Sequence, residues 1–257
     1  MNALAIALNT FREAIRNKVL YSILFFAFLV VVVGVAAIFG AASVGDHMKS
    51  IKDFSLMSIS LFGVVIAIVL GVNLLSKELG RRTIYNILSK PVARWEFLVG
   101  KFFGLYTTLV LIVAIMCTGL IGCLALFEGR ADWGLVLVSG TTLIELMVVT
   151  AVALFFSSIV VTPTLAGLFN AAIFVAGRSS SYLHYFWAEQ YPPSLQAGAH
   201  ALYWIVPHLD RFNIANEAAY GHYVSTEYLL AILAYAIGYS MVLLMLSVMR
   251  FARWEFT

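Results

Sequence analysis

The sequence predicts an all-α integral membrane protein, and its composition and hydropathy pattern carry the prediction. Of the 257 residues, 62% are apolar and only 11% are charged, and the mean hydropathy is +0.96. A soluble domain has roughly a quarter charged residues. Apolar stretches of about twenty residues recur along the chain, the length at which a helix crosses a bilayer. The composition excludes soluble enzymes and disordered linkers, and a net charge of only +3 implies no nucleic-acid partner.

Residues 1–18 are expected to form an amphipathic helix before the first crossing. Leu4, Leu8, Phe11 and Ile15 recur at helical spacing, and polar side chains occupy the other positions. Such a helix is expected to lie on the cytoplasmic leaflet, in contact with membrane lipids.

Six transmembrane helices follow from the gaps between charged residues. The stretch from Trp133 to Gly177 is too long for one crossing, and Ser157, Ser158, Thr162 and Pro163 supply a turn between two, because proline favours the first turn of a new helix. The other four crossings are expected at residues 19–39, 54–75, 102–127 and 228–251.

The distribution of Lys and Arg predicts the orientation. Eleven of these residues fall in residues 1–18, in the loop 76–101 and in the C-terminal tail, against five in the opposite loops. The positive-inside rule then places both termini in the cytoplasm.

The most charged part of the chain is the cytoplasmic loop from Ser76 to Lys101. A simple connector needs only about five residues. Gly80 can end the preceding helix, and Pro91 can begin a short helix that carries Trp95, Leu98 and Phe102 on one face. A basic, partly apolar elbow of this kind suits docking to a cytosolic protein better than a solvated loop does.

Residues 178–227 form the longest predicted external segment. Two aromatic clusters and three prolines predict short interfacial or re-entrant helices here, because aromatic rings favour the headgroup layer. An external gate and a simple aromatic belt are both open as readings of this segment.

Glu145 is the one acid deep inside a predicted crossing, where a charge costs ~2.5–3.5 kcal/mol on insertion scales. It is either a substrate or proton site, or a protonated glutamate bonded between helices or across a dimer seam. The candidate polar partners are Asn73, Asn170, Thr141 and Thr142.

The motifs of catalysis and metal binding are missing from the sequence. There is no G-x-x-x-x-G-K-[ST] for nucleotide, and no H-E-x-x-H, G-x-S-x-G or C-x-x-C. The five histidines all fall on the predicted external side without ligand spacing, so no metal site is assigned. The chain is not expected to be an enzyme or to bind a cofactor.

The cytoplasmic loop resembles that of type-2 ABC transporter permeases, in the pattern E-x-G-T-x-x-x-L-x-x-P-x-x-R-x-E-x-x-x-G-K. The matching residues are Glu78, Gly80, Thr83, Leu88, Ser89, Pro91, Arg94, Glu96, Gly100 and Lys101. Arg81 and Arg82 intervene where the family often joins glycine and threonine directly. Weaker similarities occur at Ser157, Ser158, Pro163 and Ala166, and at Pro207, Phe212 and Asn213.

This resemblance implies a single permease domain over residues 1–257, with a coupling helix in residues 76–101 that meets a separate ABC ATP-binding subunit. ATP and Mg would sit on that partner, and two copies of the permease would form a homodimer. The expected ATPase contacts are Glu78, Arg81, Arg82, Thr83, Leu88, Arg94, Trp95 and Glu96. The expected external gate includes Tyr182, Trp187, Tyr203, Trp204, Pro207 and Phe212.

The sequence therefore favours the permease subunit of an ABC exporter in a bacterial inner membrane, moving a lipid, glycolipid or hydrophobic drug. Two alternatives remain open. An assembly of the same type could transmit ATP-driven motion to an external or periplasmic protein without bulk transport. An ion-coupled secondary transporter could use Glu145 as its coupling site.

Overall fold

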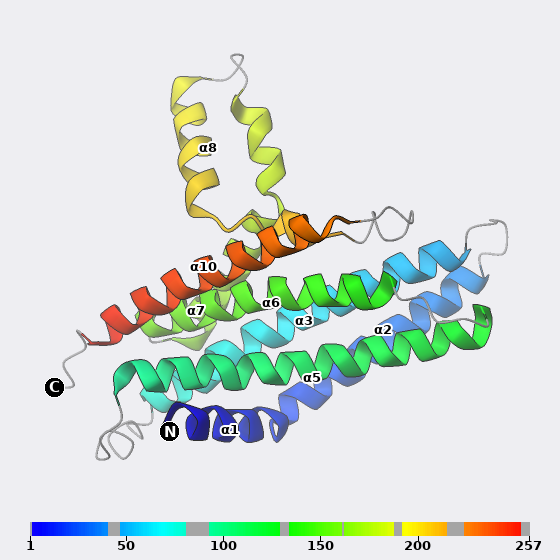
Figure 1. The fold of residues 1–257 in the computed structure, drawn as a ribbon, viewed down its shortest axis with the longest axis horizontal. Helices are drawn as coiled ribbons and strands as arrows, with labels where there is room; N and C mark the ends of the chain where they lie inside the picture. Colours follow the sequence, from blue (N-terminus) through cyan, green and yellow to red (C-terminus); the bar gives the residue numbers. More distant parts are fainter. Residues whose placement is uncertain are drawn as a thin grey trace.

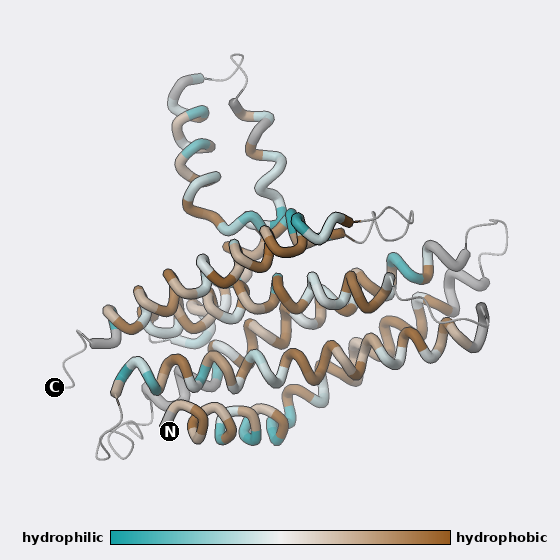
Figure 2. The backbone as a smooth tube through the Cα atoms, viewed as in Figure 1, coloured by the Kyte–Doolittle hydropathy of each residue, from teal (hydrophilic) through white to brown (hydrophobic). Residues whose placement is uncertain are grey.

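A computed structural model describes residues 2–40, 47–80, 93–128, 134–160, 162–187, 192–214 and 224–252. These residues form an elongated bundle of roughly aligned helices, from which a helical hairpin projects sideways (Figure 1). The long helices are apolar over most of their length (Figure 2). No strand occurs in the described residues. The all-α membrane protein predicted from the sequence is confirmed.

Five helices are long and apolar enough to cross a membrane: α2 (Lys18–Gly40), α3 (His47–Gly80), α5 (Arg94–Glu128), α6 (Gly134–Ile159) and α10 (Thr226–Ala252). The crossing expected next to Gly177 is α7 (Pro163–Arg178), which has 16 residues. At 1.5 Å per residue α7 is about 24 Å long, less than the ~30 Å hydrocarbon core.

Local sequence explains where several helices begin. Asn17 Oδ1 accepts a hydrogen bond from the Val19 N–H at 3.0 Å and caps α2. Ser225 Oγ accepts from the Tyr228 N–H at 3.3 Å at the start of α10. Pro163 stands in the first turn of α7, as the predicted turn requires. Gly80 ends α3, as predicted, whereas α3 and α5 extend beyond the expected crossings at their external and cytoplasmic ends, respectively.

The core lies between α3, α5 and α6. Of the five long helices, α3 and α6 are the most buried, and α2 and α10 are the most exposed. Helix α6 packs against α3, α5, α7 and α10, so it occupies the centre of the bundle. Both termini lie at the end of the bundle where α3 ends and α5 begins (Figure 1). This arrangement agrees with the predicted topology, in which the two termini share one side of the membrane.

Helix α1 (Asn2–Ile15) forms within the segment predicted for it and packs along α5. The contact face consists of small residues: the backbones approach at Gly100 and Gly104, where an added Cβ would stand 2.8 Å from Ala3 O and 2.5 Å from Ala7 O. The two helices therefore run parallel and nearly touch, as small-residue seams allow. Leu4 and Leu8 remain exposed on the other side of α1.

The seam between α1 and α5 can be tested by filling it. Gly104→Val should displace α1, since a branched side chain would collide with the Ala7 backbone and overpacking costs ~1–3 kcal/mol. In a chain whose Cys117 and Cys123 are replaced by serine, maleimide labelling of Thr10→Cys, a buried position of the seam, should then accelerate. Gly119→Val is the matched control on the same helix, because its Cβ would meet nothing within 4 Å. Equal labelling of the two variants would refute the seam.

Candidate functional site

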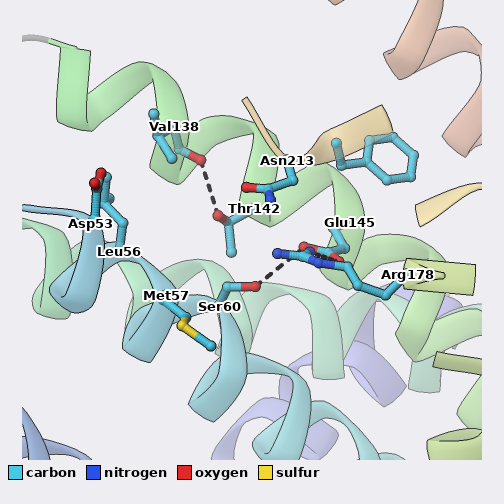
Figure 3. Close-up of a pocket in the computed structure, with 10 residues that line it drawn as sticks. Asp53, Leu56, Met57, Ser60, Val138, Thr142, Glu145, Arg178 and Asn213 are labelled. Carbon is cyan, nitrogen blue, oxygen red and sulfur yellow. Dashed lines mark hydrogen bonds and ion pairs between the residues drawn. The ribbon is translucent and has the colours of Figure 1, made fainter. Parts of the chain in front are cut away.

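A cavity of about 340 Å³ lies between α3, α6 and the segment that follows α7 (Figure 3). Its lining combines charged, hydroxyl, amide and apolar side chains. The residues are Asp53, Leu56, Met57, Ser60, Val138, Thr142, Glu145, Arg178, Phe212 and Asn213. The volume and the mixed lining are typical of a small-molecule site.

An ion pair between Glu145 of α6 and Arg178, the last residue of α7, stands at one end of this cavity. The Arg178 guanidinium donates to Glu145 Oε1, and Ser60 Oγ of α3 donates to Glu145 Oε2 at 3.3 Å. Glu145 is only 1% exposed, whereas the Arg178 side chain is 29% exposed. The interaction joins three helices around one buried carboxylate, which could not stay ionised there without partners.

The partners of Glu145 differ from the four polar residues proposed from the sequence. The Thr141 and Thr142 hydroxyls donate instead to the Val138 carbonyl, at 2.9 and 3.0 Å. Asn73 is half-buried in α3. Asn170 is buried in α7, and its amide has no hydrogen-bond partner within the part of the chain that the structure describes. Arg178 was missed because it follows an apolar stretch and reads as the start of an external loop.

The α7 end is fixed by a second polar contact. Helix η1 (Ser180–Trp187) follows α7, and the hydroxyls of Ser180 and Ser181 donate to the two carboxylate oxygens of Asp210, with the Ser180 bond at 2.6 Å. Asp210 belongs to η2 (Leu209–Phe212). The beginning and the end of the external segment therefore meet beside the ion pair.

Helix α10 holds the same region with one tyrosine face. Tyr228 and Tyr239 donate to the carbonyls of Arg211 and Ile205, at 2.7 and 2.9 Å, and the Tyr235 hydroxyl accepts from the His208 N–H at 3.0 Å. Offsets of 7 and 11 residues place these tyrosines on one side of the helix. The tyrosine face ties residues 205–211 to α10, and the sequence analysis had not predicted this.

The predicted external gate residues divide between the hairpin and its base. The hairpin consists of η1 and α8 (Pro193–Ile205) and projects across the bundle axis (Figure 1). Tyr182 and Trp204 are exposed on it, Trp204 at 78%, and Tyr203 is half-buried. Pro207 and Phe212 are buried in the base, where Phe212 lines the cavity. Trp187 ends η1, and its side chain lies outside the described residues.

Only part of the predicted ATPase-contact set can be located. Arg81, Arg82, Thr83 and Leu88 lie outside the described residues, as does the side chain of Glu78. Trp95 is 54% exposed, although Leu98 and Phe102 of the same predicted face are buried. Glu96 Oε2 accepts from the Ala93 N–H at 3.3 Å, which is the reciprocal half of a capping box and starts α5. Glu96 thus has a structural role in α5.

The ion pair predicts an asymmetric response to mutation. Arg178→Gln alone should destabilise the protein by ~3–5 kcal/mol, because the buried Glu145 carboxylate loses its counter-charge. The double variant E145Q/R178Q should lose less, since no charge is left unpaired. Thermal unfolding followed by size-exclusion chromatography in detergent measures both, with the exposed Arg211→Gln as control. Additive losses in the two single variants and the double variant would contradict the coupling.

Comparison with known proteins identifies the family. The chain matches the family model described as ABC-2 family transporter protein over residues 4–255. No match is found among curated proteins. Members of this family are membrane transport components that work with an ATP-binding subunit and are not themselves catalytic. The chain therefore belongs to the ABC-2 transporter family, as a multi-pass permease component of an ABC transporter.

Proposed function

We propose that this permease is one of two identical subunits of an ATP-driven exporter in a bacterial inner membrane, with both termini in the cytoplasm. Each copy meets a separate ATP-binding subunit through residues 76–101, and ATP and Mg are bound by that partner. The family assignment supports the partner class, and the distribution of basic residues supports the orientation.

The single observation that carries the proposal is the continuity of α3. One end of this 34-residue helix leads into residues 81–92, where the ATPase contact is expected. Asp53, Leu56, Met57 and Ser60, in the other half of the same helix, form one wall of the polar cavity. A helix of this length spans about 50 Å. A displacement imposed at the cytoplasmic end therefore reaches the cavity through one rigid element.

Helix α5 supplies a second connection from the same loop. It runs for 35 residues from Arg94, and α1 is packed against its first turns. Lys101 is buried there, with Nζ 3.8 Å from Glu13 Oε2 and 5.8 Å from the centre of the Phe97 ring. This packing favours movement of α1 with α5, so that a push on the loop acts on a braced pair of helices.

In the proposed mechanism, nucleotide-driven closure of the ATP-binding subunits displaces the loop and biases the bundle toward a second helix arrangement. Such coupling requires that the docked contact differ in free energy between the two arrangements. The cavity lies on the half of α3 that the orientation places toward the outside. Its opening there would give a substrate an exit, which is why we propose export.

A second function is favoured by the way in which the external hairpin is held. Asp210 fixes its base, and the tyrosine face of α10 holds residues 205–211. A hairpin with such a base can transmit motion of α7 and α10 to an external protein without passing a solute. Exporter and motion transmitter share the ATPase contact and differ in whether the cavity is used.

The ATPase contact is tested by reversing charge in the loop. R81E/R82E should abolish co-purification of the ATP-binding subunit encoded beside the permease while leaving membrane insertion unchanged, because a basic surface meeting an acidic partner becomes repulsive. Arg211→Glu carries the same kind of change on the predicted external side and should retain the partner. Unchanged capture by R81E/R82E would count against the proposed contact.

A further inference from the structure

The cavity beside the ion pair carries charges of both signs. Arg178 contributes a guanidinium that is 29% exposed, and Glu145 is the only acceptor it contacts within the described residues. Figure 3 shows the guanidinium extending across Glu145 toward the α3 wall. A guanidinium has five N–H donors, so most of its hydrogen-bonding capacity is unused. Asp53, an exposed carboxylate, lies toward the opposite end of the same lining.

These charges disfavour a ligand with a single charge. A small anion drawn to Arg178 would meet the negative charges of Glu145 and Asp53. A small cation drawn to Asp53 would find Glu145 already neutralised by Arg178 and would be repelled by the guanidinium. A molecule with a positive group at one end and a negative group at the other can satisfy both Asp53 and Arg178. The cavity is therefore complementary to a zwitterion.

The spacing on α3 sets the distance between the two ligand charges. Asp53, Leu56, Met57 and Ser60 follow the offsets 0, 3, 4 and 7, so they share one face of the helix. Asp53 and Ser60 are separated by roughly 10 Å of helical rise. Ser60 donates to Glu145 beside Arg178. Two charge-assisted hydrogen bonds of ~2.8 Å each leave roughly 4–5 Å between the ligand charges.

The walls between these ends suit a short apolar spacer. Leu56, Met57, Val138 and Phe212 supply apolar surface, while Thr142 and Asn213 supply polar groups beside it. Phe212 is 1% exposed, so its position is set by packing. A spacer of two carbons between an amine and a phosphate ester matches the separation, whereas the single carbon of an α-amino acid brings its charges closer together.

We propose that this cavity binds a zwitterion in which an ammonium group and a phosphate ester are joined by two carbons, the chemistry of ethanolamine phosphate. The ammonium group donates to Asp53, and the phosphate accepts from Arg178. This chemistry occurs both in a lipid headgroup and in a free metabolite. The inference deepens the proposed function by naming a ligand class for the cavity. It concerns binding to the permease alone, so it can fail while the ATPase contact stands.

Binding is tested with the purified full chain in nanodiscs of phosphatidylglycerol, titrated with ethanolamine phosphate in a calorimeter. Saturable binding is expected, with inorganic phosphate and ethanolamine each at least tenfold weaker, because each satisfies only one end of the cavity. Choline phosphate should also be at least tenfold weaker, since its trimethylated nitrogen has no N–H to donate to Asp53.

Variants then assign the two ends. Asp53→Asn, an exposed substitution, should weaken ethanolamine phosphate at least tenfold and leave or improve the affinity for inorganic phosphate. Glu227→Gln is the matched control: it removes one acid from the first turn of α10, outside the cavity, and should change nothing. The neutral double variant E145Q/R178Q keeps no unpaired charge in the bundle and should weaken both ligands at least tenfold.

The source of the ligand follows from a competition arm with phosphatidylethanolamine in the nanodisc. Loss of calorimetric binding in that bilayer identifies the headgroup of a lipid, and unchanged binding identifies a soluble zwitterion; both results support the proposed chemistry. The proposal is overturned if ethanolamine phosphate does not bind, if inorganic phosphate binds equally well, or if Asp53→Asn binds like the wild type. Capture of the ATP-binding subunit by the same preparation tests the proposed function separately.

Discussion

The buried carboxylate of Glu145 is the constraint on which the surrounding structure depends. An ionised group in the middle of a helix bundle costs several kcal/mol unless a counter-charge and hydrogen bonds accompany it. Arg178 and Ser60 supply them from α7 and α3. Three helices are thereby held in one register. The short length of α7 fits this requirement, because a helix that continued to the membrane surface would carry Arg178 away from Glu145.

The polar contacts beyond α7 extend the same constraint to the external segment. Once Arg178 is held within the bundle, the chain must turn there, and Asp210 receives the hydroxyls of both serines that follow. The tyrosine face of α10 then fixes residues 205–211. The hairpin of η1 and α8 consequently rises from a base anchored on α6, α7 and α10. The cavity lies beside this base, so the conformation of the hairpin base and the shape of the cavity are physically linked.

Small residues and long helices determine how the cytoplasmic half is built. Close approach at Gly100 and Gly104 lets α1 lie against α5 without intervening side chains, which increases dispersion contacts over several turns. Helix α1 thus has two different apolar faces: the small residues meet α5, and Leu4 and Leu8 stay exposed. The amphipathic pattern of residues 1–18 identified the leucine face, whereas alanines and glycines gave no comparable hydropathy signal.

The amino-acid sequence alone determined where helices form, because crossing a bilayer demands long apolar runs and because Pro163, Pro193 and Gly80 act on their own local backbone. The same applies to the family, whose resemblance lies in the contiguous loop 76–101. Tertiary structure alone decided which charge neutralises Glu145, how α1 docks, and that Asp53, Ser60 and Arg178 face one cavity. Those relations join residues far apart in the chain, and they depend on the depth at which α7 ends and on the closeness of helix axes, neither of which hydropathy encodes.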